Sequence, residues 1–114
     1  PIYFLSFKSP SSIPDGLTEW QAVFLSDGQV YFGKLEEHNK NYFLLSEVYY
    51  LKYASDIQQN INGSNYNTEK NLNLIKLGGE AHGPENYMFI SKDKIMFIEN
   101  LKSNSKIVNA INLK

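Results

Sequence analysis

Cysteine is absent from the 114-residue sequence, and so are long apolar runs and any large imbalance of charge. Without cysteine the chain can form neither a disulfide nor a thiolate metal site, and the sequence does not indicate whether the compartment is oxidising or reducing. No stretch reaches the roughly 20 apolar residues of a membrane-spanning helix, which predicts a soluble domain. A formal net charge of −1 lacks the strong positive field that usually accompanies binding to a phosphate backbone. This charge balance lowers the expectation of nucleic-acid binding.

Aromatic residues, by contrast, are abundant: eight tyrosines, seven phenylalanines and one tryptophan. Hydrophobic residues make up 42% of the chain, which is enough apolar surface to offset the conformational entropy lost on folding. A chain of this length is expected to form one domain. We expect an N-terminal extension at 1–18, a β-rich domain at 19–100 with a long Asn-rich loop at 55–71, and a C-terminal helix at 101–114.

The segment 20–35 predicts a β-hairpin. Its two apolar runs flank Asp27-Gly28, which suits a two-residue turn because this dipeptide tolerates positive φ. Apolar residues on both faces predict a strongly coiled strand, a bulge that switches faces, or a second face covered by another chain, and Gly33 is the natural place for a bend. In this register one face carries Val23, Leu25, Val30 and Phe32, and the other carries Trp20, Ala22, Phe24, Tyr31 and Leu35.

A long aromatic run at 41–54 predicts one strand that bends near Ser46-Glu47. Shorter runs predict strands at 72–77, 87–90 and 94–99, the last two forming a closing pair. Near the end of the chain, Ser105 is a plausible N-cap of a short helix. Its apolar face, which carries Ile107, Val108 and Ile111, is expected to pack against an open end of the sheet.

The order of these strands and two short signatures resemble the Sm-like family, small five-stranded barrels that form rings and bind RNA. The first signature resembles VFLSDGQVYFGKL at 23–35, followed by 42–45, and the second resembles FISKDKIMFI at 89–98. The matched portions run from 20 to 53 and from 87 to 98. The resemblance implies an all-β, Sm-like or SH3-like barrel of five or six strands with a short C-terminal helix.

In that family an Asp and an Asn of the first signature and an Arg-Gly pair of the second hold the RNA. The matching positions here are Asn39 and Phe43, then Ser91 and Lys92. The chain therefore lacks the planar guanidinium that stacks on a base and the Asn that hydrogen-bonds to it. RNA binding of the family type is accordingly possible but not favoured.

The chain is also similar, from Gln21 onward, to a group of small uncharacterised bacterial proteins. They carry QAVFLSDGQVYFGKL, VYYL, LGGEAHGPEN and ENLKSNSKIVNAI in this order. The resemblance implies no activity, but a hydrophobic anchor often precedes the domain in that group. Residues 2–7, IYFLSF, are therefore either an edge strand or the tail of an anchor. Membrane contact is expected only if an anchor precedes Pro1. The domain could therefore be cytoplasmic or tethered to a membrane.

His38 and His82 are the only two histidines. A metal site would need them to meet beside a carboxylate such as Glu80 or Glu85, and no spacing motif suggests this, so we expect neither a metal nor a cofactor. The segment 78–86, GGEAHGPEN, predicts a tight chain reversal or, alternatively, a surface that contacts a partner or ligand. No catalytic motif is present, so an enzyme that uses the His82 loop is only a remote alternative.

These observations predict a non-enzymatic interaction or assembly module that self-associates or binds a protein partner, with no small-molecule substrate. Edge-strand pairing and burial of aromatic side chains would provide the contact. The alternative is a divergent Sm-like protein that binds single-stranded RNA. The loop residues that would contact a partner or RNA are His38, Asn39, Lys40, Ser91, Lys92, His82 and Glu85.

Overall fold

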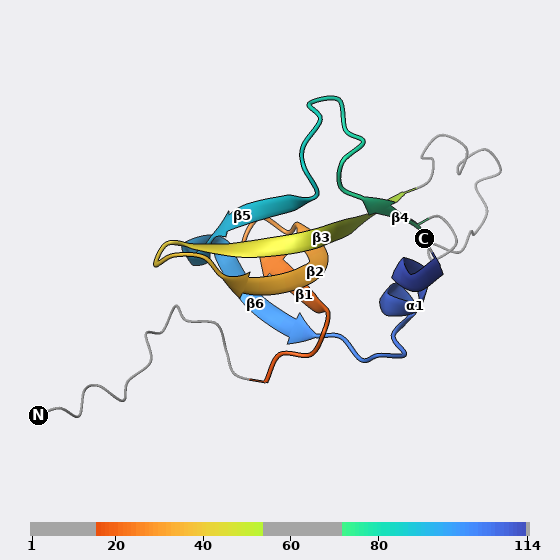
Figure 1. Cartoon of the computed structure of the whole chain (residues 1–114), viewed down its shortest axis with the longest axis horizontal. Coiled ribbons are helices and arrows are strands. Elements are labelled where there is room, and N and C mark those ends of the chain that lie inside the picture. The colour runs from red at the N-terminus through yellow and green to blue at the C-terminus, as the bar shows by residue number, and fades with distance from the viewer. Residues whose placement is uncertain (1–15, 54–71, 114) are drawn as a thin grey trace, which may run out of the picture.

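The computed structural model describes residues 16–53 and 72–113, so the expected extension up to residue 15 and the expected loop at 55–71 lie outside the described residues. Six antiparallel strands form one sheet, and a short helix follows them (Figure 1), which confirms the all-β class. The elements are β1 (Gln21–Leu25), β2 (Val30–Glu37), β3 (Tyr42–Tyr53), β4 (Leu72–Lys76), β5 (Tyr87–Ser91), the 3₁₀ helix η4 (Lys92–Lys94), β6 (Ile95–Asn100) and α1 (Lys106–Leu113).

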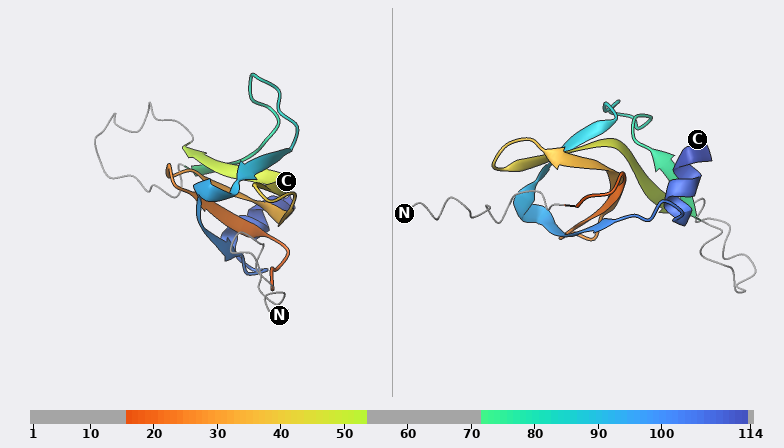
Figure 2. Two further views of the ribbon diagram at one scale, coloured as in Figure 1. Left: turned by 90° about the vertical axis from the view of Figure 1, so that its left-hand side faces the viewer. Right: turned by 60° about the horizontal axis from the view of Figure 1, so that its bottom comes forward.

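The strands lie in the order β4-β3-β2-β1-β6. β5 pairs with the same edge of β3 as β4 does, but with a different part of that strand. β3 holds two partners because it is 12 residues long: β5 pairs along Tyr42–Ser46 and β4 along Tyr49–Tyr53. The sheet curves (Figure 2), but among the described strands no ladder joins β5 to β6, so the sheet is not closed and a true barrel is not confirmed. The expectation that the last two strands pair with each other is wrong, because η4 leads the chain from β5 to β6, which pairs with β1.

The first hairpin has a three-residue loop instead of the expected two-residue turn. Val23 pairs with Tyr31, and the Leu25 amide donates a hydrogen bond to the Gln29 carbonyl at 2.9 Å. Gly28 has a φ of 94°, the left-handed conformation that absorbs the extra loop residue. The register therefore differs by one residue, and the face assignment changes. Val23 and Leu25 share a core with Tyr31 and Leu35, whereas Ala22 and Phe24 share the other with Val30 and Phe32.

Both apolar faces of this hairpin are covered from within the chain. The first core contains Val23, Leu35, Phe43, Leu45, Val48, Leu77 and Ile90. The second core contains Trp20, Ala22, Phe32, Tyr49, Leu74, Val108 and Ile111, of which the last two belong to α1. The helix thus covers the second face, and no other chain is needed for that purpose.

β3 changes faces at one irregularity of its ladder with β2. The β2–β3 register shifts by one residue around Gly33, where an added Cβ would lie only 2.6 Å from the Ser46 carbonyl oxygen, so the close approach requires glycine. On β3, Glu47 has a φ of 53°, which is rare for a residue with a side chain. As a result Leu45 and Val48, on either side of it, both enter the first core. The expected bend of β3 near Ser46-Glu47 is confirmed, and Gly33 lies opposite it on β2.

The C-terminal helix has the expected cap: the Val108 amide donates to the Ser105 hydroxyl oxygen at 3.0 Å. Val108 and Ile111 are buried and Ile107 is partly buried, so the apolar face packs as expected. The helix begins at Lys106 and not at residue 101 as expected, because a turn closed by the Ser105 amide and the Lys102 carbonyl precedes it. Within the described ranges, no helix combines the length and apolar character needed to cross a membrane.

Candidate binding surfaces

The 77–86 loop leaves the sheet where β3 changes partners (Figure 1). The Leu77 amide donates to the Val48 carbonyl at 2.9 Å, and the Glu47 amide donates to the Asn86 carbonyl at 3.1 Å. The Asn86 side-chain oxygen also accepts from the Val48 amide at 2.9 Å. Both ends of the loop are therefore fixed to the bend of β3. The expected tight reversal between strands is wrong, because β4 and β5 run in the same direction along β3 and the segment between them loops out and returns to the same point.

A groove of about 560 Å³ lies between this loop and the sheet. Three tyrosines line it, Tyr31 from β2, Tyr50 from β3 and Tyr87 from β5, together with the apolar side chains of Leu77 and Met88. Polar groups also line it, from Gln29, Lys52, Glu80 and His82. This volume and this mixture of aromatic walls with a few polar groups are typical of ligand-binding sites in proteins.

The Glu80 carboxylate has a fixed orientation at the groove. Its Oε2 accepts a hydrogen bond from the Tyr50 hydroxyl, and its Oε1 accepts one from the Gly78 amide at 2.9 Å. These bonds hold the pKa of Glu80 below its usual value, and the bond to Glu80 raises the pKa of Tyr50 to about 12. Burial, with the negative charges of Asp27 and Glu80, raises the pKa of Tyr31. At neutral pH the groove therefore holds an ionised carboxylate and neutral phenols.

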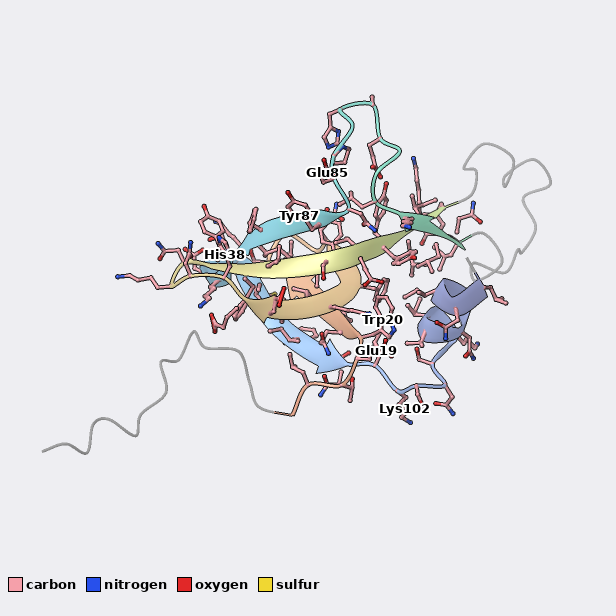
Figure 3. The ribbon with its side chains drawn as sticks, in the orientation of Figure 1. Glu19, Trp20, His38, Glu85, Tyr87 and Lys102 are labelled. Carbon is pink, nitrogen blue, oxygen red and sulfur yellow. The ribbon has the colours of Figure 1, made fainter. Side chains whose placement is uncertain are left out.

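His82 lines the same groove as Glu80, but an enzyme that uses this loop would need a buried carboxylate beside His82, and Glu80 is only partly buried. General acid–base catalysis works best with a pKa near the working pH, whereas the pKa of Glu80 is lowered and that of Tyr50 is far above neutrality. Within residues 16–53 and 72–113, no three His, Cys, Asp or Glu side chains are grouped to hold a metal ion. Glu85 is exposed on the same loop, outside the groove lining (Figure 3).

The structure brings the β2–β3 turn next to the start of η4. The Lys92 amide donates to the Asn41 carbonyl at 2.9 Å. The His38 ring centroid lies 4.6 Å from that of Phe89, and Lys40 is exposed in the turn. The loops with the predicted contact residues of the two signatures are thus neighbours, while His82 and Glu85 belong to the separate 77–86 loop.

These neighbouring loops use their polar groups internally. The Asn39 side-chain oxygen accepts from two backbone amides of its own turn, both at 2.9 Å. The Lys92 ammonium lies 2.8 Å from the Glu37 carboxylate, and the Ser91 hydroxyl donates to Asp93 at 2.6 Å. The Lys92 charge is thus paired and the Asn39 amide shapes its own turn, while Lys40 stays exposed.

An exposed aromatic surface is the feature that the sequence did not predict. We define the outer aromatic patch as His38, Tyr42, Tyr87 and Phe89; the last three are 42%, 46% and 49% exposed. Tyr87 and Phe89 have ring centroids 5.7 Å apart and alternate with inward residues along β5. This alternation in YMFIS was the available signal, but the sequence does not show which face lies outward.

Comparison with known proteins leaves the function to be argued from this geometry. No protein-family model matches the sequence, and no curated protein matches it significantly.

Proposed function

We propose that this domain is a non-enzymatic assembly module that binds further copies of itself through the edges of its sheet. The supporting observation is β5, which among the described strands pairs with β3 alone and presents Tyr87 and Phe89 to solvent. Natural edge strands usually carry charges or proline that block pairing with another chain. YMFIS has neither, so β5 can accept a second strand.

The opposite edge of the sheet supports the same proposal. Within the part of the chain that the structure describes, β6 pairs with β1 alone, and its Met96 and Phe97 are 64% and 46% exposed. Because the two edges differ, pairing β5 of one copy with β6 of the next gives a head-to-tail contact, which can close into a ring. The Sm-like resemblance of the sequence agrees with this arrangement, since members of that family form rings.

RNA binding, the alternative from the same resemblance, has less support. Lys92 is paired with Glu37, and all eleven basic residues of the chain are lysines, so no guanidinium can stack on a base. Failure of the chain to bind U-rich or A-rich oligonucleotides at low salt, measured by fluorescence anisotropy, would agree with this reading.

Light scattering coupled to size-exclusion chromatography, over a series of concentrations, tests the assembly. We expect a discrete oligomer, and we expect Phe89→Lys to weaken association by at least about tenfold, because a charge on the patch opposes edge pairing. Leu113→Lys is the matched control: Leu113 is 87% exposed on α1 and belongs to neither β5 nor β6, so its replacement should leave the oligomer intact. A monomer at every concentration, or equal effects of the two variants, would contradict the proposal.

A further inference from the structure

The groove beneath the 77–86 loop contains one carboxylate whose position is fixed. Tyr50 and Gly78 each hold one oxygen of Glu80, so the group cannot rotate away, and each oxygen retains a lone pair for another donor. The other groups of the groove that can carry charge, Lys52 and His82, are exposed. A fixed carboxylate next to apolar walls favours a cationic donor, because charge-assisted hydrogen bonds are the stronger ones.

The tyrosines add to this preference for a cation. The rings of Tyr31 and Tyr50 are inclined at 74° with centroids 6.1 Å apart, so they form two walls at nearly a right angle. Tyr87 contributes a third aromatic side chain to the lining. Ammonium groups bind favourably over aromatic rings, and more so where water is partly excluded.

The apolar part of the groove suits an aliphatic stem. Leu77 is buried and Met88 is partly buried, and both line the groove near the tyrosines. A lysine side chain has this combination of an apolar stem and a terminal ammonium, and it can bury the stem while its charge meets an acceptor. The volume of about 560 Å³ exceeds that of one side chain, so flanking residues can enter as well.

We infer that this groove binds a lysine side chain presented by an extended segment of a partner protein, with the ammonium at Glu80 and the stem over Leu77 and Met88. The groove shares Tyr87 and Met88 with β5, the strand used in the proposed assembly, but Phe89 is not among the residues that line it. Phe89→Lys alters none of the groove residues, so assembly can fail while the groove still binds.

Titration of the full-length ¹⁵N-labelled chain with short peptides, followed by NMR, tests the ligand class. The probe is N-acetyl-Leu-Lys-Leu-amide, compared with the same peptide carrying Nε-acetyl-lysine or glutamate in the centre. We expect saturable shifts at Tyr50 and in residues 77–80, with the lysine peptide binding at least about fivefold tighter than the acetylated one. Tighter binding of the glutamate peptide, or equally tight binding of free n-butylammonium, would overturn the inference.

A pair of isosteric variants tests the carboxylate. Glu80→Gln should weaken binding of the lysine peptide by about tenfold and remove its advantage over the acetylated peptide. Glu85→Gln on the same loop is the control and should change neither value. If the advantage of lysine survives in Glu80→Gln, the inference is wrong. The peptide series on the unaltered chain decides the question even if Glu80→Gln disturbs the loop.

Discussion

At the residue scale, the hydrogen bond from Tyr50 to Glu80 ties the 77–86 loop to the second half of β3. It stabilises the loop only while the phenol is protonated and the carboxyl is ionised. The pKa of Tyr50 rises from 10.0 to about 12, so an unfolded chain loses this proton first. The contribution of Tyr50 to stability is therefore complete below about pH 10 and is lost toward about pH 12.

The contribution of Glu80 to stability depends on pH in the opposite direction. Because its pKa is lowered, its contribution is complete above the usual carboxyl range and is lost as the pH falls through the lowered value. Tyr50→Phe removes the largest cause, so we expect the pKa of Glu80 to rise toward its usual value in that variant. NMR titration of the Glu80 side-chain carboxyl carbon measures this directly. Tyr53→Phe, which alters an exposed tyrosine of the same strand, is the control; a similar rise there would contradict the assignment.

At the scale of elements, Gly33 lets β2 and β3 approach closely at the bend. In Gly33→Ala the new Cβ would meet the Ser46 carbonyl oxygen at 2.6 Å and the Leu45 side chain at 2.9 Å, so backbone must shift. We expect a loss of about 1–3 kcal/mol in the free energy of unfolding, measured by chemical denaturation. Gly79→Ala is the control, because an added Cβ there meets nothing within 4 Å. Equal losses in both variants would show that the close approach is not the cause.

Local features of the elements could be predicted from the sequence. Gly33, the Ser46-Glu47 bend and the Ser105 cap were predictable because neighbouring residues determine them. The loop length of the first hairpin was not, since Ser26 before Asp27-Gly28 fits either register. The open sheet was missed because strand pairing depends on where η4 directs β6, which is a long-range property.

The candidate site was less accessible to sequence analysis. The glycines and proline of the 77–86 loop marked it as unusual, and its histidine and acids were visible. The tyrosines that meet Glu80 could not be identified, because Tyr31, Tyr50 and Glu80 are far apart in the sequence and come together only when the loop folds back on β3. The outer aromatic patch could not be predicted for the same reason: His38, between β2 and β3, contacts Phe89 of β5 although β3 and β4 separate them in the sequence.

At the scale of the whole molecule, the two cores share strands instead of forming separate units. Adjacent residues of β1, Ala22 and Val23, enter different cores, and so do Val48 and Tyr49 of β3. Neither core can open without distorting strands that support the other. Residues 16–53 and 72–113 should therefore unfold in one cooperative transition.

Trp20, the only tryptophan, is buried in the second core, so its fluorescence reports on that core while far-ultraviolet circular dichroism reports on the strands. Ile90→Ala in the first core should cost about 2–5 kcal/mol and Val108→Ala in the second about 2 kcal/mol. In each variant the two signals should share one denaturation midpoint, because the loss in either core passes through β1 and β3. Leu113→Ala, at an exposed position, should change stability by less than about 0.5 kcal/mol. A Val108→Ala variant whose fluorescence midpoint falls while its dichroism midpoint stays fixed would show instead that α1 and the second core open independently of the sheet.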